Sequence, residues 1–337
     1  MTNFLEHLRV GIGLEASGSD LSEKEAFRLR NTLMIMPIQV LYLLANKYGV
    51  EIPPEAVGIH EIVDSFLDEL SLEAKKEILS QYGDAGRVSS FVFVTKEKTP
   101  DIQSILSKAK ALLDIKPESD LWESYPYYDE VEIDHATMTL RIRFHYLLGA
   151  FSYIDESTRT PKVFRNYWRG VVVYRPNRKI LEIRVKHRSM ATKMSARIPT
   201  YLGLEPFYSI NLMDERLNKK FVDWISSLNS ATIELPLSDV SGSIIITARK
   251  GMDLRTAEKY HQELKHGRLR HGHVTIKPDD DHKINFHIYF RNCHIKYTLL
   301  TSETDIEYVI NALENISGGA MVERAEKLLT EYFGKQA

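Results

Sequence analysis

Apolar side chains in the first part of the chain recur every three or four positions, a spacing that predicts amphipathic helices. The longest such stretch covers residues 21–48 and opens with Ser22 and Glu25, which have the spacing of a helix-capping box. Pro37 interrupts this stretch, and because proline has no backbone N–H we expect a kink there. Two further helices are predicted at residues 59–67 and 71–82. Residues 1–85 are therefore predicted to form an all-helical domain.

Beyond this region the apolar pattern changes to the alternation that is typical of strands. Residues 138–146 alternate between apolar and polar side chains, which predicts a half-buried strand with a basic outer face. Val131 and Ile133 precede it across a turn at residues 134–137, so we predict a β-hairpin. Further strands are predicted at residues 87–96, 169–175, 179–188, 243–249, 273–277, 283–291 and 294–300. Further helices are predicted at residues 100–113, 212–228, 253–266, 304–313 and 322–333.

These elements predict an α+β fold. An N-terminal all-helical domain is followed by a mixed, largely antiparallel β-sheet domain and a C-terminal α+β unit. The length of 337 residues favours more than one domain. We place the domains at residues 1–85, 86–235 and 236–337.

The composition is typical of a folded soluble protein, because 43% of the residues are apolar and 27% are charged. The single cysteine, Cys293, excludes an internal disulfide bond and a metal site built on several thiolates. The N-terminus lacks the basic and apolar segments of a signal peptide. The longest apolar stretch, residues 33–44, is interrupted by Pro37 and Gln39 and is too short to span a bilayer. We therefore predict a cytoplasmic protein that does not insert into a membrane.

Charge is distributed unevenly along the chain. The formal net charge is −2, yet residues 159–197 hold twelve Lys and Arg residues against one acid, Glu182, a net charge of +11. Residues 1–85 hold seven Lys and Arg residues against fourteen acids, a net charge of −7. Such asymmetry indicates an anionic partner for the basic segment. Aromatic residues that suit base stacking interleave with its cations: Phe164, Tyr167, Trp168 and Tyr174.

Each of two predicted strands, residues 138–146 and 179–188, carries its cations on one of its own faces. In residues 179–188 aliphatic side chains alternate with Arg184, Lys186 and Arg188, which predicts an exposed basic face. A second basic stretch, residues 249–277, has a net charge of +5, and we interpret residues 265–273 as a glycine-containing loop that can approach phosphates. The predicted nucleic-acid contacts are Arg141, Arg143, Arg165, Arg169, Arg175, Arg178, Lys179, Arg184, Lys186, Arg188, Lys193, Arg197, Lys265, Arg268, Arg270 and His271.

An acidic stretch precedes the predicted hairpin. Residues 114–134 contain eight acids and one lysine. Clustered carboxylates suit a divalent cation, but they also serve as an internal counter-charge beside a basic face. We favour the counter-charge.

Histidines and one acid raise the question of catalysis. His273 and His287 would converge if the faces of their strands coincide. The sequence His273-Val-Thr275 is similar to a motif of histidine–threonine phosphoesterases, which carry two such motifs, and no second one stands at a suitable distance. Glu182-Ile-Arg184 is the nearest match to the acid-x-Lys pattern of metal-dependent nucleases, with Arg in place of Lys. We therefore predict no catalytic residue, no metal site and no cofactor.

The sequence favours a non-enzymatic protein that binds the phosphate backbone of nucleic acid, with DNA preferred to RNA. Residues 1–85 are predicted to contact a protein partner or another copy of the chain. Two alternatives stay open. One is a metal-dependent nuclease or phosphoesterase centred on Glu182 or on the histidines His271, His273 and His287. The other is a scaffold subunit of a protein complex that uses charge-complementary interfaces.

Overall fold

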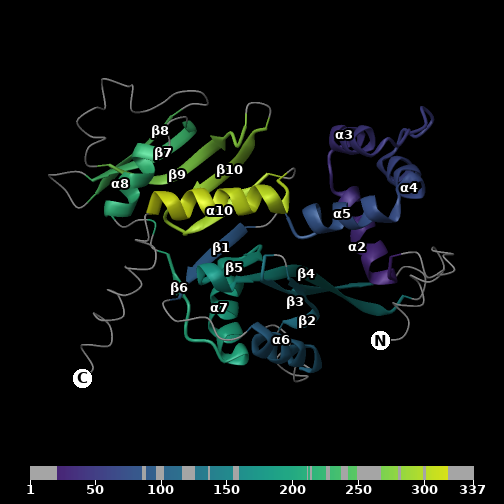
Figure 1. The fold of residues 1–337 in the computed structure, drawn as a ribbon, viewed down its shortest axis with the longest axis horizontal. Helices are drawn as coiled ribbons and strands as arrows, with labels where there is room; N and C mark the ends of the chain where they lie inside the picture. Colours follow the sequence, from purple (N-terminus) through teal and green to yellow (C-terminus); the bar gives the residue numbers. More distant parts are fainter. Residues whose placement is uncertain are drawn as a thin grey trace. The chain divides into compact units, whose positions relative to one another are not determined.

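The computed structural model of the protein divides the chain into two units, whose elements are labelled in Figure 1. It describes residues 21–85, 89–95, 102–115, 126–135, 137–154, 159–210, 212, 215–224, 228–236, 242–248, 267–279, 282–298 and 301–317. The first unit comprises residues up to 85 together with 302–304, and the second comprises the rest.

The first unit is helical, as its pattern predicts. Its helices are α2 (Glu23–Met34), α3 (Ile38–Tyr48), α4 (Ile59–Glu69) and α5 (Leu72–Tyr82). The predicted capping box is confirmed: the Glu25 backbone donates to Ser22 Oγ, and the Ser22 backbone donates to the Glu25 carboxylate at 2.9 Å. The predicted kink at Pro37 is a complete break between α2 and α3. The core of this unit includes the fully buried Leu33, Leu41, Phe66 and Ile78.

The second unit is built on one antiparallel sheet. Its strands are β1 (Ser89–Val94), β2 (Tyr127–Asp134), β3 (Thr139–Ile154), β4 (Pro161–Arg175), β5 (Ile180–Val185), β6 (Tyr208–Ser209), β7 (Leu228–Pro236), β8 (Ser243–Thr247), β9 (Arg268–Ile276), β10 (Ile284–Tyr289) and β11 (His294–Tyr297). They are ordered β2-β3-β4-β5-β1-β11-β10-β9-β7-β8, with β6 paired to β1. The predicted α+β class, with N-terminal helices before a largely antiparallel sheet, is confirmed.

The predicted hairpin is also confirmed. Strands β2 and β3 pair from Tyr127 opposite His145 to Asp134 opposite Thr139. At the turn, the Thr137 hydroxyl donates to the Asp134 carboxylate at 2.7 Å. Local hydrogen bonding therefore fixes the register that the apolar alternation favours.

The sheet runs through the position at which the sequence places a domain boundary. Residues 235 and 236 both belong to β7, and β1 pairs with β11 through Phe91 opposite His294. The strands on either side of the predicted boundary therefore form one continuous sheet within one unit.

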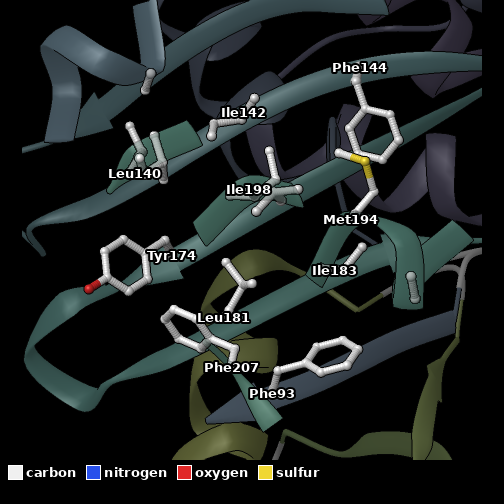
Figure 2. Packing of buried hydrophobic residues seen from close by; sticks show 14 of the residues in the cluster. Phe93, Leu140, Ile142, Phe144, Tyr174, Leu181, Ile183, Met194, Ile198 and Phe207 are labelled. Atoms are coloured by element: carbon white, nitrogen blue, oxygen red, sulfur yellow. The ribbon is translucent and has the colours of Figure 1, made fainter. Parts of the chain in front are cut away.

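Helices α6 (Ile102–Ala111) and α7 (Arg188–Leu202) cover one face of the β1–β5 part of the sheet, which we call the α7 face. Figure 2 shows the apolar side chains of this core, among them Phe144, Ile183 and Met194. Residues paired across neighbouring strands share a face, so Ile183, Phe91 and His294 all lie on the α7 face.

Helices α8 (Glu215–Trp224) and α10 (Glu303–Ser317) pack on the opposite face, the α10 face. Phe221 of α8 and Ile310 of α10 line a common apolar cavity with Val92 and Ile295 of the sheet. The two halves of the sheet are therefore covered from opposite sides. On the α7 face, β9, β10 and β11 carry half-buried polar side chains instead of an apolar core.

One sequence prediction about local structure is wrong. Residues 268–273 form the first part of β9 and not a loop: Arg268 and Leu269 pair with β7, and residues 271–273 pair with both β7 and β10. The predicted helices at residues 253–266 and 322–333 lie outside the described residues.

Among the described helices, none has both the length and the apolar character that crossing a membrane requires.

Candidate nucleic-acid interface

Two of the predicted phosphate contacts are buried in an ion cluster on the α10 face. Arg184 Nε donates to Glu182 Oε1 at 2.9 Å, and Arg175 donates to Glu182 Oε2 at the same distance. The Ser90 hydroxyl donates to Glu182 Oε1 at 2.5 Å. Arg175 also pairs with Glu307 of α10. Every carboxylate oxygen of Glu182 is thus occupied by side chains of the protein.

Burial alone would raise the pKa of Glu182, but the charges of Arg184 and Arg175 outweigh it and hold that pKa far below its ordinary value. Glu182 is 0% exposed and Arg184 is 1% exposed. The prediction that Arg184 and Arg175 contact phosphates is therefore wrong: both strand faces of β5 are covered, which alternation alone does not reveal. A metal-dependent nuclease centred on Glu182 does not fit this geometry either, because the carboxylate has no oxygen left for an ion.

Acids of β2 neutralise the cations of β3. Arg143 lies 3.1 Å from Glu130 and 2.8 Å from Glu132, and its side chain is only 10% exposed. His145 Nδ1 lies 2.7 Å from Asp129. For the part of residues 114–134 that is described here, internal counter-charge is the role that these contacts support. The expected basic face on β3 is correspondingly reduced.

Several other predicted contacts are also screened by acids or half-buried. Arg178 lies 3.3 Å from Glu307, and Arg270 lies 3.4 Å from Glu234. Arg141, Lys179 and Arg197 are half-buried. The side chain of Arg165 and all of Lys265 lie outside the described residues. The predicted contacts that are exposed are Arg169, Lys186, Arg188, Lys193 and Arg268.

Three exposed cations gather where β5 passes into α7: Lys186, Arg188 and Lys193, which we call the junction cations. Lys186 follows the last residue of β5, and its Nζ lies 4.4 Å from the centroid of the Trp168 ring. Arg188 opens α7, whose N-cap residue His187 makes no capping hydrogen bond through its side chain. Among the described residues, no acid pairs with any of the three junction cations.

Five rings from three strands form a row on the α7 face, which we call the ring row: His273, His287, His271, Tyr289 and His294. The ring centroids of His273 and His287 are 4.5 Å apart, and those of His271 and Tyr289 are also 4.5 Å apart. The centroid of Tyr289 lies 4.4 Å from that of His294. His271 Nε2 lies 3.2 Å from His287 Nδ1, which links the His273–His287 pair to the rest of the row.

The register of β9, β10 and β11 produces this row. His273 pairs with His287, and Tyr289 pairs with both His271 and His294. The sequence prediction that His273 and His287 converge is therefore confirmed. Alternation within each strand gives the face, and antiparallel pairing brings the faces together.

Three histidines of the row, His287, His294 and His271, have pKa values below the ordinary value. Burial, and then the charges of His273 and neighbouring cations, lower the pKa of His287 to about 4. Burial is also the main cause that lowers the pKa of His294 to about 4 and shifts that of His271 downward. Among the described residues, no group of three or more His, Cys, Asp or Glu side chains could hold a metal ion.

Strand pairing relates the ring row to the strand that leads into α7. His294 of β11 lies opposite Phe91 of β1, and Phe91 lies opposite Ile183 of β5. Lys296 is exposed on β11 and pairs with His287, so it shares the face of the row. Burial is the main cause that lowers the pKa of His294, and the charges of Arg188 and Lys296 lower it further.

The sequence analysis did not connect Lys296, His287, Tyr289 and His294 with the basic segment. Alternation in residues 283–291 places His287 and Tyr289 on one face, but nothing local joins that face to α7. The pairing of β1 with β11 does so. The apolar cavity on the α10 face, about 30 Å³ in volume, has room for little more than water.

Neither a protein-family model nor a curated protein sequence matches this chain. Its function is therefore inferred from the geometry of the junction cations and the ring row.

Proposed function

We propose that this protein binds nucleic acid without transforming it, and that the junction cations contact the phosphate backbone. One observation carries the proposal: Lys186, Arg188 and Lys193 are exposed around the end of β5, and no acid among the described residues pairs with them. The ring row begins two strands from β5, where His294 lies opposite Phe91 of β1. Phosphates suit the exposed cations, and nucleobases suit the rings.

Charge supports an anionic ligand. The acids near the basic segment pair with arginines other than Arg188. Glu182 binds Arg184 and Arg175, and Glu307 binds Arg175 and Arg178. The junction cations have no such partner among the described residues. A phosphate backbone would supply the missing counter-charge and would release the small ions condensed on it.

Removal of the junction cations tests the proposal. Lys186→Gln, Arg188→Gln and Lys193→Gln are combined in one variant, and its binding to labelled single-stranded and duplex DNA and RNA is measured at several salt concentrations. Each lost phosphate contact lowers the slope of log affinity against log salt by about 0.7 to 0.9. We expect weaker binding to every nucleic acid and a slope reduced by roughly two units.

A matched control removes equal charge elsewhere. Lys24, Lys76 and Lys110 are exposed lysines of α2, α5 and α6, and their combined change to Gln lowers the net charge by the same amount. We expect this control to keep the parental slope. If both variants bind like the parent, or if no nucleic acid binds at all, the proposal is wrong. Cleavage of the labelled strands would instead indicate the nuclease alternative.

Other sequence predictions stay predictions. They are a protein partner or a second copy for residues 1–85, a cytoplasmic location, a scaffold role, and a preference for DNA over RNA.

A further inference from the structure

We propose that the ring row holds the bases of a single-stranded nucleic acid while the junction cations hold its phosphates. This inference rests on the proposed function, since both surfaces would bind one strand. It adds a second contact zone and a class of ligand, because a duplex keeps its bases paired and stacked inside.

The chemistry of the ring row suits bases better than phosphates. The pKa values of His287 and His294 are about 4, so at neutral pH these two rings offer little attraction to an anion. The rings stack on one another within the row, so a ring inside the row offers a ligand mainly its edge, which in neutral imidazole has one N–H donor and one nitrogen acceptor. His271 and His287 use one donor and one acceptor of this kind with each other, since one nitrogen must donate and the other accept across their 3.2 Å contact. Nucleobases have the same combination of polar edge and flat face.

Neighbouring side chains extend this polar surface along the same strands. Thr275 pairs with Asn285 one step beyond the pair of His273 and His287. The Thr275 hydroxyl donates to the Asn285 side-chain oxygen at 2.7 Å. The five rings and these two side chains are all half-buried, so part of each remains accessible.

Position separates single strands from duplexes. In a single strand the bases turn away from the backbone, so one protein surface can contact phosphates and an adjacent one can contact bases. His294, at one end of the ring row, lies two strands from β5, the strand that leads to the junction cations, which matches this arrangement. A duplex could reach the junction cations with its phosphates but could not bring base faces to the rings.

The experiment compares ligands with and without bases. The full-length protein is titrated with a labelled oligothymidylate of about 12 nucleotides, with an abasic sugar-phosphate strand of equal length, and with a duplex. Since one stacked base contributes a factor of roughly ten or more in affinity, we expect the parent to prefer the oligothymidylate by at least that factor. The variant carrying His287→Leu and Tyr289→Leu should lose this preference and bind the duplex within about twofold of the parent.

Two further variants keep the test decisive if the double variant does not fold. His273→Leu changes one end of the row alone and should lose part of the preference. Tyr289→Phe retains the ring and should keep it. Oligouridylate measured beside oligothymidylate tells whether the strand is RNA or DNA.

The outcomes separate this inference from the proposed function. If the parent binds abasic and base-containing strands equally, or if the leucine variants keep the preference, the ring row does not hold bases, and the proposed phosphate contacts still stand. If the junction-cation variant binds like the parent, the proposed function fails. Absence of any binding would overturn both.

Discussion

Arg184 donates two hydrogen bonds to Glu182, the residue two positions before it on the same strand. Nε donates to Oε1 at 2.9 Å and one terminal nitrogen donates to Oε2 at 3.1 Å. Side chains two positions apart share a face of a strand, so the pair is local in origin. Its burial is not local, because β1 and β4 lie on either side of β5 and Ser90 and Arg175 close around the carboxylate.

Glu182→Gln should destabilise the second unit strongly. The change leaves two buried guanidinium groups without their central counter-charge, and the cost of breaking such a cluster is about 3–5 kcal/mol. All three tryptophans lie beyond residue 85, so tryptophan fluorescence during urea unfolding reports on this unit. Glu234→Gln is the control, because it breaks a partly exposed pair with Arg270 and should cost about 1 kcal/mol or less. Equal effects of the two changes would contradict the argument.

Replacement of the whole cluster should be milder than removal of its acid. A variant with Glu182→Leu, Arg175→Met and Arg184→Met buries apolar side chains of similar volume and leaves no unpaired charge in the cluster, since Glu307 keeps its ion pair with Arg178. Such exchanges are often neutral or stabilising. We expect the triple variant to unfold at a higher urea concentration than Glu182→Gln. A lower urea midpoint for the triple variant would show that the ion cluster stabilises the fold beyond the cancelling of its own buried charges.

Stability should fall as the pH is lowered from about 6.5 to about 4, because the ring row must stay unprotonated. Folding lowers the pKa of His287 and His294 from 6.5 to about 4. Between these values the unfolded chain binds more protons than the folded one, so protonation favours unfolding. The groups facing the rings, Arg188 and Lys296, are cations and do not offset this effect. Urea midpoints at pH 7, 6 and 5 measure it, and a variant with His287→Gln and His294→Gln should show a flatter dependence.

Glu182 causes a separate loss of folding stability at low pH. Its pKa is held far below the ordinary 4.5 by Arg184 and Arg175 against the opposing effect of burial. A carboxyl group of this kind stabilises the fold above the pKa of the unfolded chain, and this contribution is lost as the pH falls below that value. Most of the histidine effect lies between pH 6.5 and 4.5, above the range in which the Glu182 effect begins, so measurements above and below pH 4.5 separate the two.

Gly170→Ala should destabilise the sheet by about 1–3 kcal/mol. Gly170 of β4 pairs with Phe144 of β3, and a Cβ at this position would lie 2.5 Å from Phe144 Cζ and 2.7 Å from a methyl of Val185. The core on the α7 face is closely packed, so neither neighbour can move without cost. A second change, Phe144→Leu, should make the glycine substitution less costly than in the parent. Strict additivity of the two changes would argue against the steric explanation.

Ser22→Ala should destabilise the start of α2 by about 1 kcal/mol. The Ser22 hydroxyl accepts a hydrogen bond from the Glu25 N–H, and the Glu25 carboxylate accepts one from the Ser22 N–H. Amide hydrogen exchange in α2 measures the change. Ser22→Gly provides the graded control, because glycine at an N-cap costs only a few tenths of a kcal/mol.

Local sequence pattern determined many of the elements and which residues within them share a face, but it did not predict β6 or β7. The capping box of α2, the hairpin of β2 and β3 and the shared face of His287 and Tyr289 all depend on residues a few positions apart. Periodicity records such relationships directly, because helix and strand geometry place i+3, i+4 and i+2 neighbours together. The same reasoning wrongly predicted a loop at the start of β9, because Gly267 and Gly272 stand beside cations there.

Tertiary structure alone decided which charges reach solvent and which surfaces meet. Arg184 and Arg188 stand four positions apart in one basic segment, yet one is buried against Glu182 and the other is exposed beside His294. The difference comes from β1, nearly a hundred residues earlier, which pairs with β5 on one side and with β11 on the other. A charge count cannot contain this information, because burial and counter-charge depend on chain segments brought together only by folding.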